Sequence, residues 1–250
     1  MSGRVAIVTG AGGAIGSALC RRLTADGFAV AALDVDESPA AAVDCSLAVG
    51  CDVTDGTSVA AAVARVHDEL GEADVLVNNA GVLGPPATPL VELSPRDWDS
   101  VFAVNVTGAW NLIRAVVPTM VARGGGCVVN ISSGAAFNGV PGIGAYGAAK
   151  AALLHLTKTL ALEVAKSNVR CVAVCPGNVD TPMLSRIATV LEEAGDPNPR
   201  STLTAYHALP RLATTDDVAG VVAFLVGEDA AFVTGSAVLV DGGALAGRSE

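Results

Sequence analysis

The chain is poor in charged residues and in aromatic side chains, and it has no long apolar run. Charged residues make up 16% of its 250 residues, and Phe, Trp and Tyr together make up 4%. The longest apolar run extends from Val218 to Val226, which is about half of the ~18 residues that a membrane-spanning helix needs. We therefore expect no transmembrane segment.

Positive charge is also scarce. Fifteen Lys and Arg residues stand against 25 Asp and Glu residues, which gives a formal net charge of -10. An acidic surface repels nucleic-acid phosphates and anionic lipids, so we expect neither partner and favour a small-molecule substrate. Strand-like sequence begins at Arg4 and leaves no room for a signal peptide, so we expect a cytoplasmic location.

The six cysteines include no C-x-x-C pair, and no histidine stands close enough to suggest a zinc site. We predict no metal centre. Cys171 and Cys175 lie four residues apart in a Val/Ala-rich strand, which favours buried structural thiols. His155 and His207 are expected to be packing or surface residues rather than catalytic groups.

Short Val/Ile/Ala runs alternate along the chain with helical patterns, which predicts parallel strands joined by crossover helices. The strands are continuously apolar, as strands covered on both faces are. We predict one doubly wound, mostly parallel, seven-stranded sheet with helices on both faces. Its strands are Val5–Thr9, Ala29–Asp34, Ala48–Asp52, Val75–Asn78, Cys127–Ser132, Arg170–Cys175 and Ala237–Val240.

Two predicted helices are unusually apolar. Between Pro95 and Arg123, Asn105 is the polar member of an otherwise apolar stripe, so its amide must find buried partners. The helix that runs on from Tyr146 is apolar nearly all round, which indicates burial on two sides, in its own core and against another subunit.

A glycine-rich turn follows the first strand. Gly10, Gly12 and Gly16 lead from the strand into a helix, where glycines allow close approach of a pyrophosphate and the helix N-terminus offers amide donors. The second strand ends at Asp34, which suits the ribose hydroxyls. No basic residue for a 2′-phosphate stands at Gly13 or Val35, so we predict NAD rather than NADP in a Rossmann-type, dinucleotide-binding domain over residues 1–250.

The segment Tyr146-Gly-Ala-Ala-Lys150 places a phenol and an ammonium one helical turn apart, with Ser133 thirteen residues before the tyrosine. A tyrosine ordinarily titrates near ~10, and a nearby ammonium is expected to lower its pKa. A second hydroxyl can then hold a substrate oxygen while the phenol gives or takes its proton. The pattern predicts acid–base chemistry at Tyr146.

Together these segments resemble the classical short-chain dehydrogenase/reductase (SDR) family from the glycine turn to the C-terminus. Thr9–Gly16 is similar to the family's T-G-x-x-x-G-x-G turn, except that Ala14 replaces its middle glycine. Asn78–Gly81 resembles the N-N-A-G segment after the fourth strand. Pro176–Thr181 is similar to the P-G segment that meets the nicotinamide, and Thr234–Gly243 to the C-terminal strand.

The resemblance implies a catalytic tetrad of Asn105, Ser133, Tyr146 and Lys150. Tyr146 is then the general base in oxidation and the general acid in reduction. Lys150 is expected to lower the tyrosine pKa and to bind the nicotinamide ribose. Ser133 positions the substrate oxygen, and Asn105 holds a water that links Lys150 to solvent. Ser132 competes for the serine role, but it lies one residue nearer the tyrosine than the family spacing allows.

The resemblance also implies a cofactor site, with Asp52 and Val53 at the adenine and Asn79 and Gly81 on the adenosine side. The full predicted set is Gly10, Gly12, Gly13, Ala14, Ile15, Gly16, Asp34, Asp52, Val53, Asn79, Ala80, Gly81, Tyr146, Lys150, Pro176, Gly177, Val179 and Thr181.

Residues 182–212 contain an apolar helix interrupted by a Gly/Pro turn, which predicts a lid that orders over the substrate. A helix packed permanently on the body is the alternative. Phe137, Asn138, Val140 and Tyr206 are further candidates for the pocket wall. Arg186 and Arg200 in the lid are expected to be solvated surface residues.

The predicted activity is the NAD-dependent interconversion of a mostly apolar secondary alcohol and a ketone, in a homotetramer. A 3-oxoacyl-thioester reductase is an alternative within the same family, although it ordinarily needs NADPH and a basic carrier-binding patch. A dinucleotide-binding sensor without turnover is the alternative from another class, and the intact serine, tyrosine and lysine oppose it.

Overall fold

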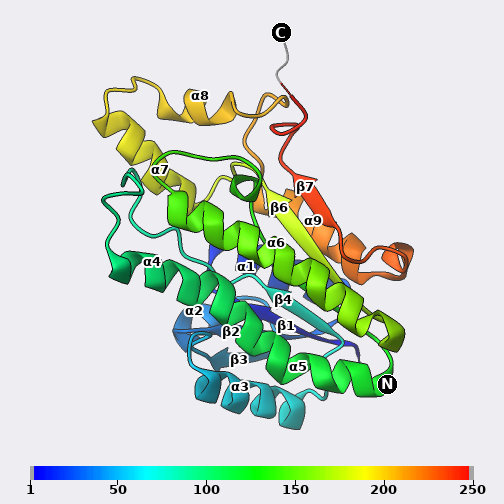
Figure 1. Cartoon of the computed structure of the whole chain (residues 1–250). Helices are drawn as coiled ribbons and strands as arrows, with labels where there is room; N and C mark the ends of the chain where they lie inside the picture. The colour runs from blue at the N-terminus through cyan, green and yellow to red at the C-terminus, as the bar shows by residue number, and fades with distance from the viewer. Residues whose placement is uncertain (1–2, 248–250) are drawn as a thin grey trace.

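Seven parallel strands form the centre of the protein in the order β3-β2-β1-β4-β5-β6-β7 (Figure 1). A computed structural model describes residues 3–247. The sheet confirms the predicted fold class, and every pairing in it is parallel. The strands are β1 Val5–Thr9, β2 Ala29–Asp34, β3 Leu47–Gly50, β4 Val75–Asn78, β5 Gly126–Ile131, β6 Val169–Pro176 and β7 Ala237–Val240.

Alternate residues of the strands build two separate cores. On β1, Ala6 and Val8 face one helical layer, while Val5 and Ile7 face the other, as the two-residue period of a strand requires. The first layer contains α1 Ala14–Ala25, α2 Glu37–Ala41 and α9 Thr215–Val226, and the second contains α3 Gly56–Glu69, α5 Ala109–Arg123 and α6 Gly144–Val164.

The predicted strand limits hold to within two residues. β3 stops at Gly50 rather than at the predicted Asp52, because Asp52 already belongs to the following turn. Its carboxylate accepts hydrogen bonds from the backbone and hydroxyl of Thr54. On β6, Cys171 and Cys175 are fully buried free thiols, as predicted, and burial raises the pKa of Cys175 to about 11. The domain predicted over residues 1–250 includes residues 1–2 and 248–250, which lie outside the described part.

The helix predicted from Pro95 to Arg123 is continuous but not uniform. It consists of α4 Pro95–Phe102, a wider π-helical turn, η1, over Ala103–Gly108, and α5. Asn105 lies within η1, and its side-chain amide donates to the carbonyl of Val101 one turn earlier. The helix passes a length and composition test for membrane spans, but half of its most apolar stretch is buried inside the protein, as in a core helix.

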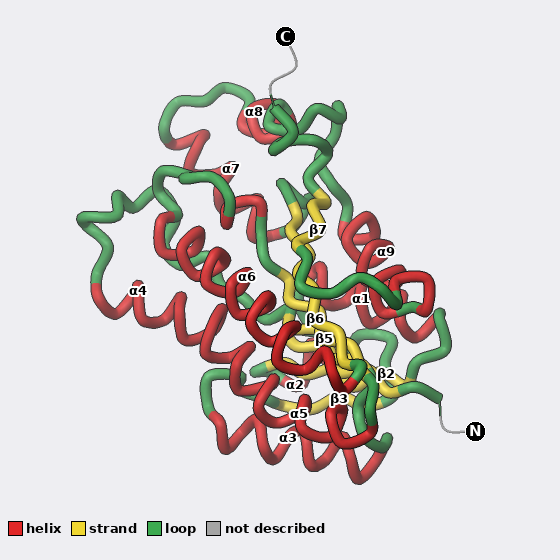
Figure 2. Tube along the Cα trace, turned by 45° about the vertical axis from the view of Figure 1, so that its right-hand side comes forward, coloured by secondary structure: helices red, strands yellow, loops and turns green. Residues whose placement is uncertain are grey.

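The strand order reverses between β1 and β4, because the chain adds strands outward from β1 in both directions. Crossover helices leave such a reversal on opposite faces of the sheet, which opens a crevice at the carboxyl ends of the strands. The predicted lid forms α7 Pro182–Glu193 and α8 Pro199–Thr204, which project beyond this end of the sheet (Figures 1 and 2).

Candidate functional site

Two positions of the glycine turn, Gly10 and Gly16, are so closely packed against the backbone that only glycine fits there. Gly10 has a positive φ of 62°, and a Cβ there would lie 2.8 Å from the Cα of Ala80. At Gly16 a Cβ would overlap the carbonyl oxygen of Gly10. Ala14 is different because it is exposed at the first position of α1, so its methyl group meets no such obstacle. The one departure from the family turn is therefore tolerated.

Asp34 lies beside this turn at the end of β2. Its Oδ2 accepts a hydrogen bond of 2.9 Å from the backbone N–H of Gly12, which aims the carboxylate at the crevice. Val35 is 73% exposed and contributes no charge. Within residues 3–247, none of the ion pairs involves Asp34. The carboxylate is thus free to accept hydrogen bonds from a ribose.

The segment after β4 is tied to the glycine turn by two side chains. Asn79 Nδ2 donates to the carbonyls of Thr9 and Gly10, at 2.9 and 3.1 Å. Thr9 Oγ1 accepts from the N–H groups of Asn79 and Ala80. The side chain of Asn79 therefore shapes the floor of the crevice. Thr9 was absent from the predicted site, although the threonine of the family turn pointed to it.

The loop after β3 is held against α5. Asn111, a buried residue that the sequence analysis did not single out, donates from Nδ2 to the carbonyl of Val53 at 2.9 Å. A Cβ on Gly108 would come within 2.6 Å of Val53 Cγ2. This close packing fixes Asp52 and Val53 at the same end of the sheet as the glycine turn, where the adenine was predicted.

The structure brings Ser133, Tyr146 and Lys150 together between the end of β5 and the start of α6. The Ser133 hydroxyl lies beside the phenol of Tyr146 and acts on its pKa. Lys150 is buried, its Nζ donates to the carbonyl of Ile131 at 2.9 Å, and it lies 5.6 Å from the centroid of the tyrosine ring. Ser132 points elsewhere, because its hydroxyl donates to the carbonyl of Lys150. Ser133 is therefore the serine beside the phenol.

The pKa of Tyr146 shifts in the direction opposite to the predicted one. Burial raises the pKa of Tyr146, and the neighbouring Ser133 hydroxyl opposes that rise without reversing it. Burial lowers the pKa of Lys150 to about 8. The predicted lowering of the Tyr146 pKa is therefore wrong for the chain by itself, because the ammonium lies over the ring and is itself easily deprotonated.

Asn105 has the buried partners that its position demands, with one exception. Its Nδ2 donates to the carbonyls of Val82 and Val101 at 2.9 and 2.8 Å. Its Oδ1 has no partner within residues 3–247. A Cβ on Gly81 would lie 2.8 Å from this oxygen and 3.2 Å from Lys150 Nζ, so both groups converge on Gly81. Because an unpaired buried acceptor costs about 1–3 kcal/mol, the site suits a water between Asn105 and Lys150.

The opposite wall of the crevice is the loop that follows β6. Gly177 packs against the turn after β7, and Val179 forms a single parallel bridge with Ala213. Thr181 accepts the N–H of Leu184 and thereby caps α7, so the same residue begins the lid. Arg200 in α8 is ion-paired with Asp180, and both groups are largely exposed.

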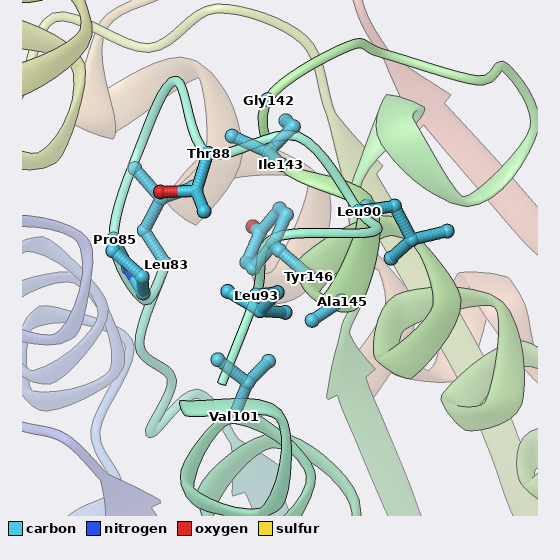
Figure 3. Close-up of a pocket in the computed structure, with 11 residues that line it drawn as sticks. Leu83, Pro85, Thr88, Leu90, Leu93, Val101, Gly142, Ile143, Ala145 and Tyr146 are labelled. Atoms are coloured by element: carbon cyan, nitrogen blue, oxygen red, sulfur yellow. The ribbon is translucent and has the colours of Figure 1, made fainter. Parts of the chain in front are cut away.

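A small cavity lined mostly by apolar residues adjoins the phenol of Tyr146 (Figure 3). Its volume is about 10 Å³, which is room for about one water. The side-chain hydroxyls of Thr88 and Tyr146 are its only polar side-chain groups. The other lining residues are Leu83, Pro85, Leu90, Leu93, Val101, Gly142, Ile143, Gly144 and Ala145. The loop before α4 was not predicted to form this wall, and the predicted Phe137, Asn138, Val140 and Tyr206 are exposed instead.

The residues present fit a nicotinamide dinucleotide. The predicted cofactor residues follow the carboxyl ends of β1, β2, β3, β4 and β6 or begin α1 and α6, so they gather around one crevice. Glycine at positions 10, 16 and 81 lets the segments around the crevice pack closely, where a Cβ would clash with protein atoms. The N-terminus of α1 faces the turn and offers amide donors to phosphates.

Comparisons with known proteins agree with this geometry. A family model described as enoyl-(acyl carrier protein) reductase matches residues 10–244. The 2-(R)-hydroxypropyl-CoM dehydrogenase of Xanthobacter autotrophicus is 41% identical over 96% of this chain and 97% of its own length.

Solved structures give the same result. Aldohexose dehydrogenase of Thermoplasma acidophilum superposes with a TM-score of 0.90 at 33% identity, covering 99% of this chain and 96% of its own. The 3-ketoacyl-(acyl-carrier-protein) reductase of Brucella melitensis, complexed with NADH, superposes with a TM-score of 0.86 at 31% identity, over 96% and 98% of the two chains. This chain belongs to the short-chain dehydrogenase/reductase family of oxidoreductases.

Proposed function

We propose that the protein interconverts a secondary alcohol and a ketone with NAD(H), and that Tyr146 is the proton donor and acceptor. The observation that carries the proposal is the approach of the Ser133 hydroxyl to the Tyr146 phenol, with the buried Lys150 beside them. Two hydroxyls that converge from the body of the protein can bind one substrate oxygen, and a third group can return a proton to the phenol.

The chain's own residues handle the proton, while the bound dinucleotide would supply or accept the hydride. In reduction the Tyr146 hydroxyl donates its proton to the carbonyl oxygen, and in oxidation the phenolate accepts the alcohol proton. Ser133 holds that oxygen in place. Because the raised pKa of Tyr146 keeps the phenol protonated at neutral pH, the chain by itself is prepared for reduction. Lys150 Nζ, with a water on Asn105 Oδ1, would return the proton from solvent.

The preference for NAD(H) rests on Asp34. Its carboxylate is oriented by Gly12 and has no cationic partner in the described chain. A 2′-phosphate there would place two negative groups side by side and remove the bidentate ribose contact. The Brucella relative was solved with NADH.

The substrate class follows from the walls of the site. Apolar side chains dominate the cavity beside Tyr146, and Arg200 is already ion-paired with Asp180. These features favour a mostly apolar alcohol or ketone over an anionic one. The Brucella relative favours 3-oxoacyl thioesters instead, and the description of the family model names another reduction on acyl carrier protein. The acidic balance of this chain disfavours an acidic carrier protein. A sensor without turnover would not need the serine, tyrosine and lysine together.

A panel of secondary alcohols tests the proposal directly. NADH should form from NAD with selected alcohols, and its absorbance follows the reaction. A 3-oxoacyl thioester with NADPH should react with a lower kcat/KM than the best alcohol with NAD. Binding of NADH without turnover of any alcohol, ketone or thioester would favour the sensor. Efficient thioester reduction with NADPH would favour the carrier-protein activity.

We also propose a homotetramer. Trp98, Trp110 and Leu162 are exposed on α4, α5 and α6, which lie side by side on one face, while Phe224 and Leu239 are exposed on α9 and β7. Two such apolar faces suit two interfaces related by two-fold axes. Light scattering after size exclusion at micromolar concentration should give about four times the 24.8 kDa chain mass. A stable monomer would refute the proposal, and a dimer would leave only one interface.

A further inference from the structure

His207 lies where three segments of the site meet. It follows α8 at the end of the predicted lid, and its side chain is buried. It contacts the loop after β6 through Gly177 and the turn after β7 through Gly242. The sequence predicts a packing or surface role for this histidine, and burial alone would agree with packing.

Both ring nitrogens of His207 are used, and their roles are fixed. Nδ1 lies 2.8 Å from the carbonyl oxygen of Arg211, which can only accept, so Nδ1 carries the hydrogen. Nε2 accepts the backbone N–H of Asn178 at 3.0 Å, so Nε2 must be unprotonated. The two hydrogen bonds together require the neutral ring with its proton on Nδ1.

The contact with the loop after β6 is tight. A Cβ on Gly177 would lie 2.8 Å from Nε2, and the φ of +56° at Gly242 brings that turn close to the ring from the other side. Asn178 also reaches back to the lid, because its Nδ2 donates to the carbonyl of Leu203 at 2.9 Å. Asn178 is flanked by Gly177 and Val179, both of which belong to the predicted nicotinamide-side loop.

We propose that His207 is a positioning residue that joins the lid to the nicotinamide-side loop through the N–H of Asn178. This inference rests on the proposed function of the site, since the loop matters only where a nicotinamide binds. The junction holds only while the imidazole is neutral. A proton on Nε2 would turn two donors toward each other, release Asn178 and loosen the loop against the lid.

The charged groups around His207 are engaged with other partners. Arg211, whose carbonyl receives Nδ1–H, has its guanidinium paired with Asp217 at 2.6 and 3.0 Å. Asp241, beside Gly177, uses its carboxylate to accept the N–H groups of Gly243 and Leu245. On the lid side, Arg200 and Asp180 are paired with each other. Because the bond from the Asn178 N–H needs an unprotonated Nε2, the acid side of the pH profile tests the junction.

Two substitutions separate positioning from simple packing. His207→Gln keeps an acceptor for Asn178 and a donor for Arg211 but does not titrate, whereas His207→Phe keeps the ring and loses both hydrogen bonds. Ketone reduction with NADH is the informative direction, because Tyr146 must be protonated there and so gives no acid-side decline of its own. His67→Gln on α3, outside the site, is the matched control.

We expect wild-type protein and His67→Gln to lose kcat/KM toward acid pH. His207→Gln should keep neutral-pH kcat/KM within about threefold and lose that decline, while His207→Phe should fall at least about tenfold at every pH. An unchanged acid-side decline in His207→Gln, or full activity in His207→Phe, would overturn the inference.

Hydrogen exchange of the chain without cofactor gives a second readout that does not depend on turnover. His207→Phe should accelerate exchange of residues 176–181 at least about tenfold relative to wild type, and His207→Gln should not. Equal exchange in the Phe variant would contradict the junction. If no ketone is reduced but the exchange result holds, the junction stands and the proposed function fails.

Discussion

The two walls of the crevice are built differently. The wall formed by β5 and α6 carries Ser133, Tyr146 and Lys150 and is continuous with the two cores of the sheet, whose strand residues are almost completely buried. The lid wall has a separate small cluster made by Leu184, Leu203 and Leu212. We propose that the wall of β5 and α6 determines the chemistry, whereas the lid, with its own small cluster, selects the substrate.

The polar contacts of the two walls also differ in burial. Lys150 is 3% exposed and bonded to the backbone of β5, so its position is tightly constrained. The ion pair of Arg200 with Asp180 has side-chain exposures of 68% and 48%, and surface pairs of this kind contribute only about 0–1 kcal/mol.

The largest effect is expected on the wall of β5 and α6. Tyr146→Phe should lower kcat at least about 10³-fold and leave the affinity for NADH nearly unchanged, because the lost hydroxyl acts in the transition state. Steady-state kinetics and NADH fluorescence titration measure the two quantities. Retention of most activity would remove the tyrosine from the mechanism, and a parallel loss of NADH binding would indicate a structural defect instead.

The cofactor preference is the next effect in size. kcat/KM should favour NAD(H) over NADP(H) by about 100-fold, because Asp34 accepts the ribose hydroxyls and repels a 2′-phosphate. Asp34→Ser should reduce that preference mainly by weakening NAD(H) binding. Comparable kcat/KM for the two cofactors in the wild type would be inconsistent with the role of Asp34.

Lys150→Met should separate stability from activity. Burial lowers the Lys150 pKa from 10.5 to about 8, so keeping the ammonium in the fold costs about 3 kcal/mol below pH 8. Losing the hydrogen bond to Ile131 offsets part of this, so we expect a net gain of about 1–2 kcal/mol at pH 7 with loss of turnover. The gain should shrink as pH rises from 8 toward 10.5, where the unfolded lysine also loses its proton.

Thermal and urea unfolding at pH 7 and pH 10 measure this gain. Lys158→Met, an exposed lysine on the same helix, is the control and should change the unfolding free energy little at either pH. A destabilised Lys150→Met protein at pH 7 would show that the hydrogen bond to Ile131 outweighs the cost of burial.

Arg200→Ala is expected to have the smallest effect. The unfolding free energy should change by less than about 0.5 kcal/mol, kcat should be unchanged, and KM should rise a few-fold because the lid is less well held. Arg21→Ala, which breaks the exposed pair with Asp216 away from the lid, is the matched control and should leave KM as it is. A large loss of kcat in Arg200→Ala would mean that the lid takes part in the chemistry.

The parts of the structure that the sequence predicted are those governed by local patterns. The apolar strands and the turn at Gly10 and Gly16 follow from residue period and from steric limits that only glycine meets. The approach of Ser133 to Tyr146 followed from family spacing. The sequence did not predict the π-helical turn at Asn105, because the residue pattern there is that of a regular helix.

The sequence also does not predict contacts between residues that are far apart in the chain. The bond from Asn178 to His207 joins residues 29 positions apart, and the contact of Thr9 with Asn79 joins residues 70 apart. The direction of the Tyr146 pKa depended on where Lys150 lies relative to the ring, which residue spacing alone does not determine. These are the contacts that connect the two walls or set the electrostatics between them.

The division between the walls is tested most directly by relative kcat/KM across a panel of secondary alcohols that differ in the size of one substituent. Ser133→Ala should lower every rate by a similar factor, whereas Leu184→Ala, which opens the lid cluster, should change the ratio between large and small alcohols by at least about fivefold. The account is contradicted if Ser133→Ala reorders the panel and Leu184→Ala lowers all rates equally.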